Sequence, residues 1–421
     1  MESMPTPAAT SATPEKLKFT GYQKFVVAAL AFLQFTIILD FMILSPLGAI
    51  LMPALNITTA QFGWVVSCYA FSAGVSGILA AGFADRFDRK KMLLFFYTGF
   101  LLGTLFCGLA PDYPSLLIAR TVTGLFGGVM GSIVFAISTD LFPYEMRGRV
   151  MGLLQTAFAA SQVLGIPFSL YLSNSLGWHA PFILIVAFGA VVGLILLWKL
   201  RPINGHLAYK AERSPLRHLI HTLTQPRYLQ GFAATCLLAT GGFMLMPFGS
   251  NFHVHNLGVS LDMLPAIYMA TGIASLILGP LSGKLSDTYG KYRMFVVGTV
   301  VTALACYVYT RMGISPLWAV VGINILMFVG VTARIISSSA LASALPLAPD
   351  RGAYMAISSS LQQVSGGIAA AVAGLIVVQK NDGPLEHFDT LGDIVIVSAV
   401  ISAVLMYGIH RYLKNLKAAQ S

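Results

Sequence analysis

The chain has 421 residues, of which 56% are hydrophobic and only 10% are charged, and its formal net charge is +10. A soluble domain carries about a quarter of its residues as charged side chains, so this composition excludes an ordinary soluble protein. The same hydrophobicity excludes a disordered or collagen-like chain.

Apolar stretches long enough to cross a bilayer, about 20 residues each, recur along the whole sequence. We predict twelve transmembrane helices over residues 23–47, 61–83, 92–110, 115–139, 149–172, 179–199, 228–251, 261–283, 292–312, 316–341, 353–379 and 391–412. The expected fold class is all-α, a polytopic membrane protein with two six-helix bundles. We expect an N-terminal tail (1–21), a first bundle (22–200), a central linker (201–227), a second bundle (228–413) and a C-terminal tail (414–421).

The basic residues are distributed unevenly over the two sides of the predicted membrane. With twelve crossings, both termini and the linker lie on one side, and nearly all of the 26 Lys and Arg residues fall there. The exceptions are Arg120, Arg311, Arg334 and Lys380. The positive-inside rule therefore predicts cytoplasmic N and C termini in a cell inner (plasma) membrane. The net charge indicates topology and contact with the lipid bilayer, and no nucleic-acid partner is expected.

Three short sequences recur in the same order in the two halves of the chain. Residues 81–91 resemble residues 283–293, with Asp85 matching Asp287. The other matched pairs are Pro46-Leu47-Gly48 with Pro247-Phe248-Gly249, and residues 147–152 with residues 351–356. Duplicated six-helix halves imply a pseudo-two-fold arrangement with a binding site between the halves, as in many secondary transporters.

The first of these repeats resembles the signature loop of the major facilitator superfamily, G-x-L-x-D-x-x-G-R-[KR]-x. The second copy keeps Gly283, Leu285, Asp287, Gly290 and Lys291. The first copy keeps Asp85, Arg86, Arg89 and Lys90, but has Ala81 and Asp88 at the two glycine positions. The resemblance covers essentially the whole chain and implies the major facilitator fold.

Further motifs resemble one branch of that family. Residues 117–127 (LIARTVTGLFG) are similar to the helix 4 motif of proton-coupled members. Residues 39–41 (LDF) and 177–182 (GWHAPF) resemble the twelve-helix drug/proton antiporter and sugar-efflux (arabinose efflux permease-like) branch. The helix 5 antiporter motif, ending G-P-x-x-G-G, is replaced here by GIPFSL at 165–170, which leaves the direction of transport open.

Charged residues inside the predicted helices are the candidates for ion coupling. Asp40 is the only acid well inside an apolar run. An ionised carboxylate at that depth costs roughly 2.5 to 3.5 kcal/mol, so it needs a cavity or a partner. Arg120, at a similar depth in helix 4, is the predicted partner. We interpret Asp40 and Arg120 as the proton-coupling residues, while a static ion pair that only holds the helices together is the alternative.

Polar side chains at other intramembrane positions are candidates for the substrate cavity. Arg334 on helix 10 would add a second positive charge, unless it reaches the inner surface instead. Amides could line the cavity or equally bridge two helices. The candidate cavity residues are Gln34, Asp40, Arg120, Gln155, Gln162, Asn324, Arg334, Gln362 and Gln363.

The repeated loop predicts a cytoplasmic gate. Asp85 is expected to pair with Arg147 or Arg149 and Asp287 with Arg351, while the alternative is a charged loop that only sets topology. The candidate gate residues are Asp85, Arg86, Arg89, Arg147, Arg149, Asp287, Lys291 and Arg351.

The sequence contains no phosphate-binding loop, no G-x-S-x-G elbow and no H-E-x-x-H zinc pair. We therefore expect no enzyme activity, no cofactor and no metal site, and an ion gradient as the energy source. The predicted function is proton-coupled efflux (antiport) of a small organic compound or drug by a monomer. The alternatives are proton-coupled symport (uptake) of an organic anion or other small metabolite, and a membrane receptor that does not transport.

Overall fold

The computed structural model describes residues 19–83, 86–208, 215–347, 350–379 and 383–420. Within them, twelve helices are long and apolar enough to cross a membrane, so the twelve predicted spans and the all-α fold class are confirmed. The first six spans are built from α1 (Gly21–Ile43), α2 (Gly48–Leu55), α3 (Thr59–Phe83), α4 (Arg89–Leu109), α5 (Tyr113–Leu141), α6 (Tyr144–Ala160), the π-helix η2 (Ser161–Gly165), α7 (Ile166–Leu176) and α8 (Ala180–Lys199).

The connecting segment contains η3 (Gly205–Ala208) and α9 (Pro215–Leu223). The last six spans comprise α10 (Pro226–Leu245), η4 (Met246–Phe248), α11 (Gly249–His255), η5 (Leu261–Met263), α12 (Leu264–Tyr289), α13 (Lys291–Tyr309), α14 (Leu317–Ala342), α15 (Arg351–Ile376) and α16 (Phe388–Gln420). A small antiparallel hairpin of β1 (Val378–Gln379) and β2 (Leu385–Glu386) joins the last two helices, with Val378 opposite Glu386.

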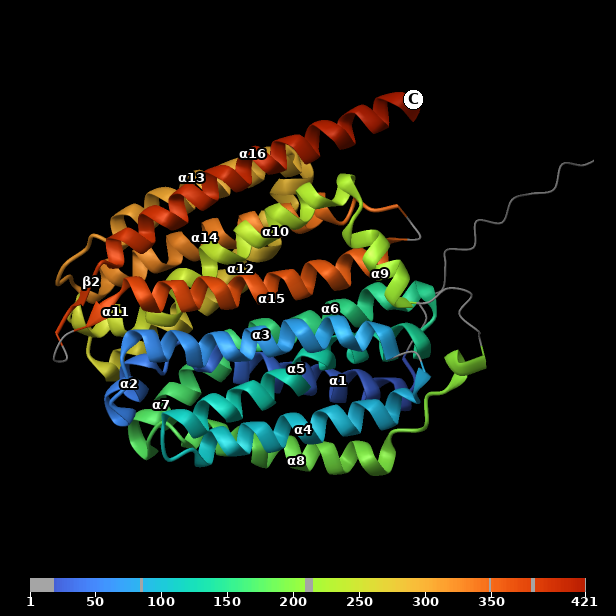
Figure 1. Cartoon of the computed structure of the whole chain (residues 1–421), viewed down its shortest axis with the longest axis horizontal. Helices are drawn as coiled ribbons and strands as arrows, with labels where there is room; N and C mark the ends of the chain where they lie inside the picture. The colour runs from blue at the N-terminus through green and yellow to red at the C-terminus, as the bar shows by residue number, and fades with distance from the viewer. Residues whose placement is uncertain (1–18, 84–85, 209–214, 348–349, 380–382, 421) are drawn as a thin grey trace, which may run out of the picture.

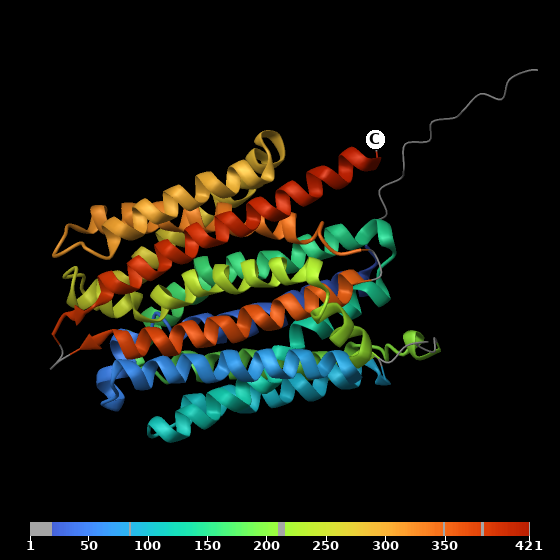
Figure 2. The ribbon, with the colours of Figure 1, turned by 45° about the horizontal axis from the view of Figure 1, so that its top comes forward.

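Spans 1–6 and spans 7–12 form two groups of helices, called here the first half and the second half (Figure 1). α1 begins and α16 ends on the same side of the molecule, called here the terminal side, and the opposite side is the far side. Between the halves, α15 packs along α3, and α12 packs on α7 and η2. Figure 2 shows α15 (orange-red) running beside α3 (blue) in a turned view as well.

Helix ends are fixed by local hydrogen bonds where the chain enters each span. Asp88 accepts a hydrogen bond from the backbone N–H of Lys91 and so caps α4. Asp112 caps α5 by accepting from the N–H of Ser115 at 3.0 Å, and its bonds from Ser115 hold the pKa of this carboxyl below its usual range. Such caps satisfy amide groups that a helix leaves unpaired in its first turn.

The predicted boundaries are wrong where proline or an irregular turn interrupts a helix. Helix 1 was expected to continue to residue 47, but α1 ends at Ile43 and the chain turns before α2, because Pro46 lacks the N–H that a helix interior needs. Pro247 likewise lies in the short 3-10 segment that separates α10 from α11. The repeated Pro-x-Gly sequence therefore breaks both spans near the far side.

Among the described residues, the apolar cluster shared between the halves lies toward the far side. One cluster there includes Leu39 and Phe62 of the first half together with Phe248 and Phe388 of the second. Toward the terminal side each half has a cluster of its own, around Tyr97 in the first half and Tyr354 in the second. Hydrogen bonds between the halves also gather toward the far side, including Thr59 Oγ1 to the carbonyl of Val377 at 2.6 Å. The far side is therefore the closed side in this structure.

Candidate functional site

The charged pair predicted from sequence is formed inside the first half. Arg120 Nη1 on α5 lies 2.9 Å from Asp40 Oδ2 on α1, and the two side chains are 1% and 0% exposed. Thr104 on α4 donates to Asp40 Oδ1 at 3.1 Å. Both carboxylate oxygens are thus satisfied within the protein, as a buried charge requires.

The arginine side of the pair is less completely satisfied than the acid side. The guanidinium carbon of Arg120 lies 4.4 Å from the centre of the Tyr69 ring on α3, a cation–π geometry. Its Nε is buried and has no hydrogen-bond partner among the residues that the structure describes. One donor of Arg120 is therefore left unpaired in this part of the chain.

Small residues bring the helices of this site close enough to form it. A Cβ on Gly103 of α4 would lie 2.8 Å from the backbone nitrogen of Thr123 on α5. A Cβ on Gly124 of α5 would collide with Ser72 and with the backbone of Tyr69 on α3. Close approach of this kind is typical of small residues at membrane helix interfaces. It places Thr104, Arg120 and Tyr69 around Asp40.

The candidate amides are distributed over several helices of both halves. Gln34 is half-buried with an unpartnered Oε1. Gln155 and Gln362 are exposed, whereas Gln162 is half-buried beside Gly272 of the second half.

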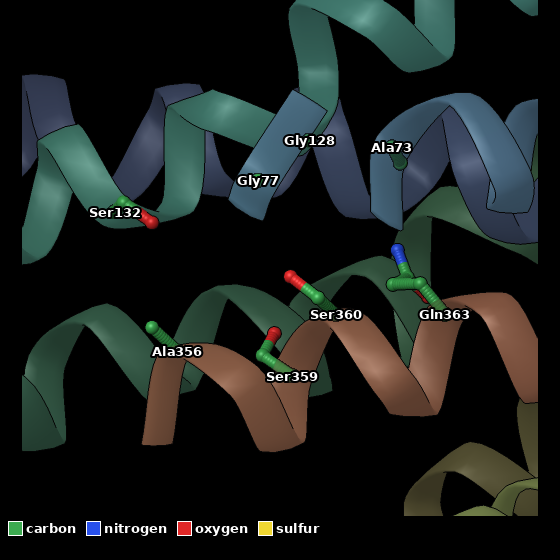
Figure 3. A pocket seen from close by; sticks show the side chains of 8 residues that line it. All are labelled: Ala73, Gly77, Gly128, Ser132, Ala356, Ser359, Ser360 and Gln363. Carbon is green, nitrogen blue, oxygen red and sulfur yellow. The ribbon is translucent and has the colours of Figure 1, made fainter. Parts of the chain in front are cut away.

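Gln363 lines a small cavity between α3, α5 and α15. Its volume is about 60 Å³, and Figure 3 shows Gln363 and two serines of α15 facing Gly77 and Gly128 of the first half. The lining is completed by Ala73, Ser132, Ala356, Ser359 and Ser360. A space of this size holds one or two water molecules and is too small for an organic substrate.

Asn324 and Arg334 have partners inside the second half. Asn324 Nδ2 lies 2.9 Å from Nε2 of His253, and it also donates to the carbonyl of Val320 at 2.8 Å. Arg334 is 4% exposed and donates to Ser402 Oγ on α16 at 3.1 Å. Among the described residues Arg334 has no acidic partner within ion-pair distance, and its Nε is unpartnered.

The described candidate gate residues lie at the terminal side. Asp85 lies outside the described residues, so its expected pair with Arg147 or Arg149 stays a prediction. Arg89 pairs with Asp140 at the end of α5, 3.1 Å away, an acid that sequence reasoning missed. Arg147 donates to the carbonyls of Thr139 and Phe142, and so caps the end of α5.

The remaining gate candidates are exposed. Arg149 lies over the ring of Phe19 at 4.8 Å. Asp287 and Arg351 form no ion pair with one another in the described part of the chain. Also exposed on this side are Arg86 and Lys291.

Sequence reasoning missed Thr104 and Tyr69, which complete the Asp40 site. No signal in the sequence distinguishes them, because hydroxyl and aromatic residues occur throughout the apolar runs. His253 was visible as a polar residue near the end of a span, but its contact with Asn324 was not predicted.

Comparison with known proteins identifies the family. The Major Facilitator Superfamily profile matches residues 30–369 and 231–413. "Uncharacterized MFS-type transporter YceJ" of Bacillus subtilis (strain 168) is 24% identical over 92% of this chain and 97% of its own length. "Probable sugar efflux transporter" of Mannheimia succiniciproducens is 24% identical over 81% of this chain and 82% of its own length. The inward-facing, occupied structure of a bacterial homologue of the human lysosomal transporter Spinster superimposes with a TM-score of 0.71 at 16% identity, over 94% of this chain and 98% of that one.

The profile match covers the two halves and their connection, and both relatives and the solved structure span most of this chain. The resemblance seen in the sequence is confirmed, as is the expectation that the chain is not an enzyme. The protein belongs to the major facilitator superfamily and is a secondary transporter of a small molecule.

Proposed function

We propose that the protein exports a small organic compound or drug in exchange for protons, with Asp40 as the proton carrier and Arg120 as its electrostatic partner. The observation that carries the proposal is the fully buried Asp40–Arg120 pair, in which one arginine donor has no partner among the described residues. A buried carboxyl that is paired with one specific basic side chain is typical of functional sites. The efflux named in the Mannheimia succiniciproducens relative supports the direction.

Thermodynamic linkage sets the sign of the coupling at this pair. A substrate group that donates to the Asp40 carboxylate competes with the proton, so binding of one favours release of the other, and the result is antiport. A substrate anion that takes Arg120 instead removes the cation from Asp40 and favours its protonation, and the result is symport. The same pair can therefore support either direction, and the chemistry of the substrate decides.

One observation favours the second candidate, proton-coupled uptake of an organic anion or other small metabolite. Arg334 is a buried arginine without an acidic partner among the described residues, and Nε of Arg120 is unpartnered as well. Two incompletely satisfied guanidinium groups suit an anionic ligand. We keep antiport as the proposal, because Arg334 contacts Ser402 and Phe295 within the second half, away from Asp40.

The proposed cycle rocks residues 22–200 against residues 228–413 about the space between them. We assign the terminal side to the cytoplasm of an inner (plasma) membrane, in line with the basic residues gathered there. The closed far side and the separate apolar clusters of the terminal side support an inward-open state. The protein acts as a monomer in this proposal, with the linker 201–227 joining the halves.

Transport in proteoliposomes tests the proposal and separates it from its alternative. With an acidic lumen, an antiporter accumulates an added neutral substrate as protons leave, by up to about tenfold per unit of pH gradient for each proton exchanged. A screen of amphipathic drugs, sugars and organic acids would be measured in this way, with a protonophore as the control. Accumulation that requires an alkaline lumen instead supports symport. Transport that is the same with an acidic and with an alkaline lumen contradicts proton coupling.

We further propose that the repeated loops gate the cytoplasmic side. In the present state Arg89 and Arg147 bind α5 within the first half, while Asp287, Lys291 and Arg351 are exposed. The acids of the two loops, Asp85 and Asp287, would pair with bases when the terminal side closes. Arg86, Arg149 and Arg351 are then the available partners at that side.

We expect Asp287→Asn to weaken closure of the terminal side and so to increase the population open to the cytoplasm. The measurement is the reactivity of a cysteine introduced at Gln155, which is exposed, in a background lacking the native cysteines. The matched control is Asp262→Asn, an exposed acid in η5 at the far side. Equal reactivity in the Asp287 variant and the control would contradict the gate.

A further inference from the structure

His253 is a buried titratable side chain that the coupling proposal does not use. It lies on α11 and is 3% exposed. Its Nε2 is 2.9 Å from Asn324 Nδ2 on α14 and 3.4 Å from the hydroxyl of Tyr309 on α13. Its Nδ1 is buried and has no hydrogen-bond partner in the described part of the chain.

These contacts specify a neutral imidazole. Asn324 Nδ2 donates to the carbonyl of Val320, which fixes the orientation of the amide and leaves its second N–H to donate to His253 Nε2. Nε2 is therefore an acceptor and the proton is on Nδ1. A second proton, on Nε2, would point at the N–H of Asn324. The resulting imidazolium charge would also be buried without a counter-ion, which is costly.

The described residues around His253 offer no acid close enough to compensate such a charge. The titratable groups in contact with its ring are Tyr309 on α13 and Tyr268 on α12, whose ring centre is 6.5 Å away. The strand β2, which also packs on α11, carries Glu386, and this side chain is exposed. No acidic side chain among the described residues lies within ion-pair distance of His253. From the first half, the neighbouring α2 carries no titratable side chain.

The same short helix holds the far side closed. Ser250 of α11 donates to the carbonyl of Ser45 at 3.0 Å and accepts from the N–H of Ala49 at 3.3 Å. Asn251 donates to Met52 Sδ at 3.0 Å. Three hydrogen bonds from the adjacent residues Ser250 and Asn251 thus join α11 to the first half, while His253, one turn on from Ser250, joins the same helix to α13 and α14.

We infer that His253 is a second proton-binding site, which binds a proton only when the far side is open and whose deprotonation permits α11 to close it. A proton bound by one conformation alone shifts the equilibrium toward that conformation, by up to tenfold per pH unit. A water-exposed imidazole titrates near about pH 6.5, so the shift sets in below that pH. Because the proton leaves before closure, His253 senses pH and carries no proton across, unlike Asp40.

Only the assignment of the far side to the cell exterior rests on the proposed function. On that assignment, external acid holds the transporter open outward. The inference itself concerns which conformation binds the proton, and it stands whether the chain works by antiport or by symport.

The experiment measures far-side opening as a function of pH by distances between spin labels at Ala54 and Ser260, both exposed, in a background lacking the four native cysteines. We expect the ratio of long to short distances to rise up to tenfold per pH unit below about 6.5. His253→Gln should abolish the rise. His255→Gln, on the same helix, is the matched control and should retain it.

Two further variants keep the test decisive. Asn324→Asp gives the protonated imidazole an acidic partner, so the far side should be able to close at low pH. The rise in the ratio of long to short distances should therefore be smaller in this variant. Asp40→Asn should leave the rise unchanged, which separates this inference from the coupling proposal. A wild-type ratio that does not change with pH, or a rise that persists in His253→Gln, would overturn the inference. If His253→Gln does not fold, an undiminished rise in Asn324→Asp would do so.

Discussion

Asp40→Asn is expected to abolish accumulation driven by a pH gradient while leaving exchange of substrate down its own gradient. Asparagine has nearly the same shape and can still accept from Thr104 or Arg120, which lie 3.1 and 2.9 Å from the carboxylate oxygens. It cannot take up or release a proton, so the link between proton binding and substrate binding is removed. The accumulation ratio should fall from up to about tenfold per pH unit to one.

The measurement is uptake into proteoliposomes with and without a pH gradient, at equal protein content. Asp140→Asn is the matched control, because Asp140 also pairs with an arginine, Arg89, but lies at the end of α5 and is 24% exposed. It should retain gradient-driven accumulation. Undiminished coupling in Asp40→Asn, with the control also active, would show that the buried pair is structural and that protons are carried elsewhere.

The Asp40–Arg120 pair could be predicted because charges are rare in apolar runs and each needs a partner. The other residues that surround the pair could not be predicted. Thr104 and Tyr69 are chemically ordinary residues in a membrane helix, and their role follows from the close approach of α3, α4 and α5 at Gly103 and Gly124. A small-residue spacing predicts contact between helices without specifying which side chains the contact brings together.

The direction of polar side chains was the least predictable property. Asn324 was a candidate either for the substrate cavity or for a bridge between helices, and its amide is bonded to His253 within the second half. Arg334 was a candidate either for the cavity or for the inner surface, and it lies against Phe295 and Ser402. Helical periodicity locates a residue along a span, but all faces of these helices are apolar, so the sequence does not indicate which face meets a neighbour.

The twelve spans followed from length and hydrophobicity, but the breaks at Pro46 and Pro247 were not included in the predicted bounds. Both prolines stand inside apolar stretches that remain long enough to cross a membrane without interruption. Membrane helices tolerate proline where neighbouring groups satisfy the freed carbonyls, so proline alone does not indicate a break. The repeat of the Pro-x-Gly sequence was the available signal.

Arg120→Gln is expected to destabilise the folded protein by about 3–5 kcal/mol, since it leaves the Asp40 carboxylate buried without its counter-charge. The Asp40→Asn/Arg120→Gln double variant removes both charges and should recover most of that loss, so that the two single effects are not additive. Unfolding in detergent, followed by heat or denaturant, measures all three.

Arg334→Gln is the comparison that isolates the ion pair from the arginine itself. Arg334 is 4% exposed and has no acidic partner among the described residues. Its substitution therefore removes a buried charge and leaves no buried carboxylate without a counter-charge. We expect this variant to lose less unfolding free energy than Arg120→Gln. Two results would contradict this: additive losses of unfolding free energy in the Asp40 and Arg120 variants, or an equal loss in the Arg334 variant. Either would mean that packing of the guanidinium, and not its charge, stabilises this site. The ion pair would then contribute little free energy, and it could not store the coupling energy that proton-driven transport requires.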